Sequence, residues 1–141
     1  MQETLDRKAP AWRWSLAQKA EIRWWRHYLR GKPPADYLAW KRAYWAGFLQ
    51  SAGLQLPAGS KVLDVGCGPA GVFLVLETCR LTAVDPLLER YERTLPHFRR
   101  ADYPHVQFVS APFETAPLEG SFDCIFCLNA LNHLRDPLFS L

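Results

Sequence analysis

The sequence predicts an α/β fold in which a doubly wound parallel sheet follows a helical arm. Four short apolar segments alternate with turns and helical segments after residue 53, which is typical of βαβ units. A glycine-rich turn follows the first of these segments directly. All six tryptophans fall within residues 1–50, where basic residues also outnumber acidic ones. We therefore expect a helical arm or lid over residues 1–53 and a body over residues 54–141.

Length and composition restrict the class of protein. The 141 residues suffice for one compact domain with an appended arm, and 49% hydrophobic with 22% charged residues excludes a disordered or collagen-like chain. No segment approaches the ~20 apolar residues of a membrane span, and the polar first residues do not resemble a signal peptide. Four cysteines are too few for a secreted disulfide framework, so we expect a cytoplasmic location.

Two helices are expected in the arm. Ser15 can cap the first, with Gln18 at the capping-box position, and Gly31 would end it. The second would run over residues 36–53. The first helix gathers Ala17, Ala20, Trp24 and Tyr28 on one face, with Trp25 beside them. One broad side of the second must pack against something, and it contains Tyr37, Trp40, Tyr44, Trp45, Phe48 and Leu49.

The positive charge of the arm has more than one interpretation. The spaced basic residues of the first helix favour an ordinary solvated face, and a face that binds RNA or a membrane surface is the weaker alternative. Lys41 lies inside the aromatic side of the second helix. It can extend its charge to the rim, or it can be a cation held among aromatic rings near a bound anion.

The body alternates strands and helices in the order that a parallel sheet requires. Apolar runs predict strands at residues 61–65, 81–84, 106–109 and 122–128, and helices at residues 72–79 and 87–94. The fourth strand is apolar on both of its faces, as a buried parallel strand should be.

The glycine-rich turn indicates a nucleoside cofactor. Gly66 to Gly71 matches G-x-G-x-x-G after a strand, and Asp85 ends the next strand at the distance expected of a ribose-binding acid. Asp64, two residues before Gly66, suits the cationic end of S-adenosylmethionine and would repel a pyrophosphate. A dinucleotide site, as in an NAD-dependent oxidoreductase, is therefore disfavoured.

Four segments, in order, carry a resemblance to a known family. They are Val62-Leu-Asp-Val-Gly-Cys-Gly-Pro-Ala-Gly71, Ala83-Val-Asp-Pro86, the loop from Glu114 to Ile125, and Asn129-Ala-Leu-Asn-His-Leu-Arg-Asp-Pro137. Together they resemble the class I S-adenosylmethionine-dependent methyltransferases, which have a Rossmann-like fold. The resemblance covers about residues 55–140 and leaves the methyl acceptor open.

The resemblance implies a cofactor site residue by residue. The methionine end would lie at Asp64, Gly66, Cys67 and Gly68, the ribose at Asp85, and the adenine between Pro86 and Phe113. Leu128 and Asn129 would face the methionine portion or the donated methyl group. Ala70 stands where the family often has a third glycine. Ala111 and Pro112 stand where the family often has an acid that meets the adenine amino group, so Glu114 or a backbone carbonyl would make that contact instead.

Two further candidates have an ordinary structural alternative. Cys124 and Cys127 lie three residues apart on a strand, so their thiols should point to opposite faces, and we expect structural cysteines with no metal site. His133 is a weak candidate for a general base, although a histidine at such a position more often packs or caps a helix.

The resemblance also implies where the fourth strand lies in a complete sheet of the family. The expected strand order here is 3-2-1-4, and in the family the fourth strand is internal, so the chain resembles a methyltransferase truncated after strand four. An exposed edge at that strand predicts self-association or completion by a partner. We expect methyl transfer to an unidentified, small-molecule acceptor, with a non-catalytic cofactor-binding fragment as the alternative.

Overall fold

The computed structural model describes residues 10–128. Its helices are α1 (Ala11–Tyr28), α2 (Pro34–Ser51) and α3 (Leu88–Thr94), and its strands are β1 (Lys61–Val65), β2 (Arg80–Val84), β3 (Val106–Val109) and β4 (Cys124–Phe126). All four predicted strands are present. The last is shorter than the predicted 122–128: its pairing with β1 runs only from Val62–Cys124 to Asp64–Phe126.

The four strands form one parallel sheet in the order β3-β2-β1-β4, which confirms the predicted order. The chain moves outward from β1 through β2 to β3 and then crosses back to the other side of β1. The carboxyl ends of β1 and β4 therefore flank the point where the order reverses, which is where open α/β sheets bind ligands.

The two faces of the sheet are covered differently. Val62, Leu81 and Ala83 point into the main core, which also contains Leu29 and Trp45 from the arm. The other face carries a smaller cluster around Leu63, Val65 and Val84, packed against the connection between β3 and β4. In the part of the chain that the structure describes, the helices lie over the first face, and arm and body share one core.

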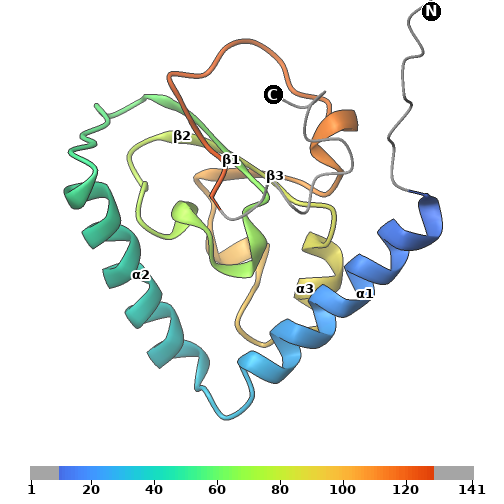
Figure 1. Ribbon diagram of the computed structural model, residues 1–141. Coiled ribbons are helices and arrows are strands. Elements are labelled where there is room, and N and C mark those ends of the chain that lie inside the picture. Colours follow the sequence, from blue (N-terminus) through green and yellow to red (C-terminus); the bar gives the residue numbers. More distant parts are fainter. Residues whose placement is uncertain (1–9, 129–141) are drawn as a thin grey trace, which may run out of the picture.

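In the arm, α1 and α2 form a V that is joined at a turn near Gly31, and the sheet lies between the two helices (Figure 1). The predicted cap at Ser15 is wrong: α1 begins at Ala11, because the Pro10 carbonyl accepts the N–H groups that close its first turn. The second helix begins at Pro34, since proline is favoured at a first helical position. Neither helix, nor α3, has the length and apolar content needed to cross a membrane.

The predicted helix over residues 72–79 is also wrong. That segment holds one short 3-10 turn, Val72–Leu74, preceded by another at Gly68–Ala70. The N–H groups of Leu74, Val75 and Cys79 each donate to the carbonyl three residues earlier. Such bonds form separate tight turns and no α-helix.

Candidate functional site

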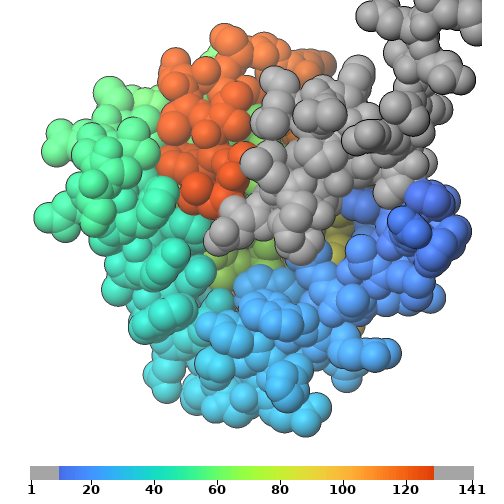
Figure 2. Space-filling model, in the orientation of Figure 1, coloured from blue at the N-terminus to red at the C-terminus, as the bar shows by residue number. Residues whose placement is uncertain are grey.

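A cavity of about 930 Å³ lies between the two helices of the arm, α1 and α2, and the carboxyl end of the sheet. This volume is near the upper end of the roughly 300–1,000 Å³ of small-molecule sites. Figure 2 shows the yellow-green part of the chain recessed between α1, in blue, and α2, in cyan. The aromatic residues that line the cavity are Trp14, Trp24, Trp25, Tyr44, Trp45 and Phe113.

The structure brings seven of the nine predicted cofactor residues together around this cavity: Gly66, Cys67, Gly68, Asp85, Pro86, Phe113 and Leu128. Asp64 lies beneath the glycine turn and is not part of the cavity lining. Asn129 and the candidate base His133 lie outside the described residues. The assignment of all of them to a ligand stays a prediction.

The glycine turn directs its backbone donors toward the protein. Gly66 and Gly68 have φ of 64° and 61°, a left-handed conformation that favours glycine. The N–H groups of Gly66 and Cys67 donate to the Val84 carbonyl at 2.8 and 3.3 Å. A phosphate needs free N–H donors at such a turn, so this geometry suits a ligand ammonium better than a pyrophosphate.

Asp64 supports the second half of the turn. Its carboxylate accepts the Val72 N–H at 3.1 Å and is only 5% exposed. It lies so close to Gly71 that a Cβ there would overlap it, and the same Cβ would come within 2.7 Å of the Cys67 carbonyl. Burial raises the pKa of Asp64 to about 7. This carboxylate therefore explains why the turn ends in glycine.

Asp85 joins the end of β2 to the turn at the cavity wall. One carboxylate oxygen accepts the Gly68 N–H at 3.0 Å, and the other accepts the Leu87 N–H at 2.8 Å. Burial raises the pKa of Asp85 to about 7, and the charge of Glu21 adds to the shift. An ionised carboxylate has about four acceptor sites, so Asp85 can still accept bonds from ligand hydroxyls.

Two tryptophans of the arm contact the turn directly, a feature that sequence reasoning missed. The indole Nε1 of Trp45 donates to the Ala70 carbonyl at 2.9 Å. The Trp25 ring lies 3.6 Å from the position that a Cβ of Gly68 would take. The spacing of four residues from Tyr37 to Trp45 through Lys41 was a signal for an inward stripe, but only the fold shows what the stripe meets.

The inward face of α1 is displaced from the predicted apolar face toward Trp25, which was predicted to lie beside that face. Trp24 is 53% exposed and stacks on Tyr28 with ring centroids 4.8 Å apart. The half-buried stripe instead contains Trp14, Gln18, Glu21, Trp25 and Tyr28. The alanines and Trp24 face the open cavity, which leaves them accessible, while the polar Glu21 turns inward because the Tyr91 hydroxyl donates to it at 3.0 Å.

The remaining chemical candidates of the described chain do not converge on this cavity. Cys124 packs against the main core and Cys127 against the smaller cluster, so the two thiols lie on opposite faces, as predicted.

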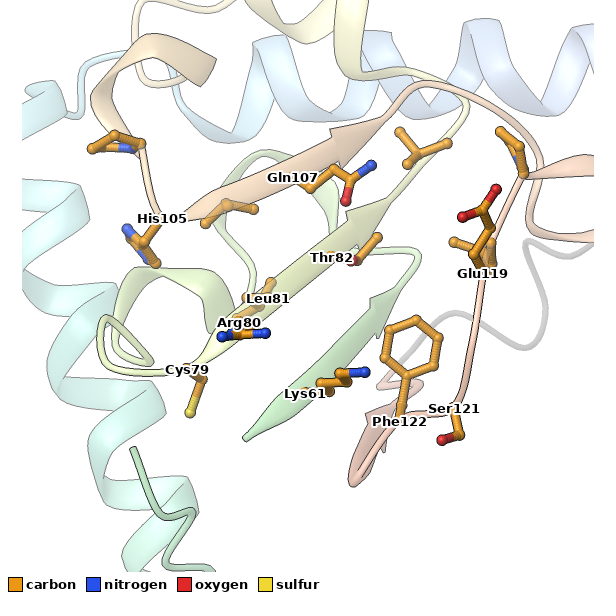
Figure 3. Close-up of a pocket in the computed structure, with 15 residues that line it drawn as sticks. Lys61, Cys79, Arg80, Leu81, Thr82, His105, Gln107, Glu119, Ser121 and Phe122 are labelled. Carbon is orange, nitrogen blue, oxygen red and sulfur yellow. The ribbon is translucent and has the colours of Figure 1, made fainter. Parts of the chain in front are cut away.

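A second cavity, of about 740 Å³, lies over the other face of the sheet. Figure 3 shows Lys61, Thr82 and Gln107 along its floor and Glu119, Ser121 and Phe122 at its side.

Comparison with known proteins gives the family. A family model described as a methyltransferase domain matches residues 37–139. The chain is 35% identical over 86 residues to a ubiquinone biosynthesis O-methyltransferase of Albidiferax ferrireducens, covering 57% of this chain and 33% of that protein. A protein of the same name from Xanthomonas axonopodis pv. citri is 40% identical over 89 residues, covering 57% of this chain and 35% of its own length.

Other similar proteins have different names. An S-adenosyl-L-methionine-dependent Diels-Alderase of Talaromyces variabilis is 34% identical over 86 residues, covering 57% of this chain and 30% of that protein. A solved structure of coclaurine N-methyltransferase, bound to N-methylheliamine and SAH, has a TM-score of 0.45 and 23% identity over 83% of this chain and 42% of that one.

The chain spans about a third of the length of the curated relatives it matches. The family model nevertheless covers well over half of the chain, and it includes the glycine turn, Asp85 and the strands that carry them. The chain belongs to the class I S-adenosylmethionine-dependent methyltransferases.

Proposed function

We propose that this chain binds S-adenosyl-L-methionine in the cavity between the arm and the glycine turn, for methyl transfer to a small-molecule acceptor. One observation carries the proposal: seven residues predicted from the sequence line a single cavity at the switch point of the sheet. The names of the curated relatives, which include ubiquinone biosynthesis O-methyltransferases, support a small-molecule acceptor.

The lining residues fit such a cofactor. The Asp85 carboxylate would accept bonds from the ribose hydroxyls, while Pro86 and Phe113 would lie against the adenine. The turn at Gly66 would take the methionine ammonium, and Leu128 would face the methyl end. When bound, the cofactor supplies a methyl group on a sulfonium that is already an activated leaving group.

The protein's share of the reaction would be alignment and exclusion of water. Aromatic residues of α1 and α2 form apolar walls over the glycine turn, among them Trp24, Tyr44 and Trp45. Holding two reactants in line and removing water can supply much of a methyl-transfer rate. The proposal therefore needs no acid–base pair, and His133 stays a prediction for acceptors that must lose a proton.

Calorimetric titration of the purified chain tests the cofactor. We expect S-adenosylhomocysteine to bind and NAD not to bind. Asp85→Asn should weaken the binding about tenfold or more, because it removes charge from two hydrogen bonds and from the ribose contact. Asp102→Asn, at an exposed aspartate outside the cavity, is the matched control. Preference for NAD, or no binding by a folded chain, would contradict the proposal.

A second function is cofactor binding without methyl transfer. It is favoured by the relative that is named an S-adenosyl-L-methionine-dependent Diels-Alderase. Equal binding of S-adenosylmethionine and its product, with no methylated product from any phenol, amine or thiol offered, would support it. RNA binding and self-association through β4, where Ile125 is 59% exposed, stay predictions.

A further inference from the structure

Lys41 occupies an unusual place for a lysine. It lies on the inward stripe of α2, one turn from Tyr37 and one turn from Trp45, which are only 5% and 8% exposed. The hydrogen bond from Trp45 to Ala70 holds this part of α2 against the glycine turn. Lys41 therefore lines the cavity from a rigid helix rather than from a mobile loop.

The ammonium of Lys41 is surrounded by aromatic rings. Its Nζ lies 4.4 Å from the ring centroid of Tyr44, 5.0 Å from that of Trp45 and 5.8 Å from that of Trp40. Within residues 10–128, no carboxylate lies at ion-pair distance from it. Desolvation lowers its pKa. A partly buried charge without a counter-charge costs free energy, which ring faces recover only in part.

Three acidic residues line the cavity, Glu21, Asp85 and Glu114, and none of them lies at ion-pair distance from Lys41. Asp85 binds two backbone N–H groups, and Glu21 accepts the Tyr91 hydroxyl. Arg13, another cation of the lining, is exposed and lies over Trp12, 5.3 Å from its ring centroid. Lys41 is therefore the half-buried cation in an aromatic-walled cavity.

From this geometry we propose that Lys41 binds a carboxylate of a ligand held in the cavity. Two sources share this chemistry: the methionine carboxylate of the cofactor, and an acid group on the acceptor. The inference rests on the proposed function and deepens it. It assigns the aromatic rings a second role, since they hold the ammonium at the cavity wall until the carboxylate arrives.

The first arm of the test compares two cofactors that differ only in this group. S-adenosylmethionine and decarboxylated S-adenosylmethionine are titrated into the wild-type chain, Lys41→Met and Lys41→Arg. If the cofactor is the source, Lys41→Met should weaken S-adenosylmethionine about 10- to 100-fold and leave the decarboxylated form unchanged, and Lys41→Arg should retain most of the affinity. Lys32→Met is the control, because Lys32 lies over the Tyr28 ring outside the cavity.

The second arm tests the acceptor with the cofactor site saturated by S-adenosylhomocysteine. The probes are 3-hydroxybenzoate and phenol, aromatic molecules that differ by one carboxylate. If the acceptor is the source, Lys41→Met should weaken 3-hydroxybenzoate about 10- to 100-fold and leave phenol unchanged.

Each failure has a distinct signature. If Lys41→Met changes neither arm, or weakens the charged and uncharged partners equally, Lys41 has only a structural role and the inference is overturned while cofactor binding stands. If the folded wild-type chain binds neither form of the cofactor and neither probe, the proposed function fails and the inference fails with it.

Discussion

Replacing Trp45 with Phe tests how the arm is attached to the glycine turn. The phenyl ring keeps the aromatic contact with Phe48 but removes the Nε1 donor from the buried Ala70 carbonyl. An unpaired buried carbonyl costs about 1–3 kcal/mol. The smaller ring also leaves a gap at a side chain that is 8% exposed, which adds about 1 kcal/mol. We therefore expect the free energy of unfolding to fall by about 2–4 kcal/mol.

Urea denaturation followed by tryptophan fluorescence and circular dichroism measures this change. Trp40→Phe is the matched control, because Trp40 lies on the same helix and is 54% exposed; its effect should stay within about 0.5 kcal/mol. Trp45→Phe should also weaken S-adenosylhomocysteine binding, since the turn loses its support. Equal losses of stability in the two variants would refute the claim that Trp45 anchors the arm.

Three further predictions concern the turn and its supports. Gly71→Ala should lower the free energy of unfolding by about 1–3 kcal/mol, because its Cβ overlaps the Asp64 carboxylate. Gly47→Ala should raise it by up to about 1 kcal/mol, because a Cβ there meets no other atom and alanine favours a helix. Urea titration of both variants compares these effects. Burial raises the pKa of Asp64 and Asp85 to about 7, so the folded chain binds more protons than the unfolded chain above about pH 4. Stability should therefore fall by a few kcal/mol between about pH 4 and 7, and less in Asp85→Asn; a rise over that range in urea titrations would oppose the assignment. Tyr91→Phe removes a hydrogen bond to α1, so amide hydrogen exchange in α1 should accelerate while β1 exchange stays unchanged.

Much of the body could be predicted because its signals are local. Apolar runs bounded by turn residues define strands whatever surrounds them, and the glycine turn needs a backbone conformation that few other residues adopt. The spacing between Gly66 and Asp85 follows from the length of one strand–turn–strand unit, so it too can be recognised in the sequence. The strand order, and residues such as Phe113 and Leu128, were instead implied by the family resemblance that these local motifs carry.

The arm was harder to predict because its signals are ambiguous. With six tryptophans in the first fifty residues, a helical wheel offers several aromatic faces, and the choice between Trp24 and Trp25 depends on what each meets. Likewise, the apolar residues at 72–79 are compatible with a helix, but in the structure their N–H groups donate to carbonyls three residues earlier and form separate tight turns.

The sequence by itself determined the family, the parallel sheet and the residues that gather at its switch point, because these depend on short patterns and strand lengths. Tertiary structure alone decided which faces of the two arm helices turn inward, that Trp45 and Trp25 contact the turn, and that Lys41 stands among aromatic rings without a carboxylate partner in residues 10–128. The physical reason is that these contacts join residues far apart in the chain, and their free energy depends on the shape and polarity of the partner surface, which no local pattern records.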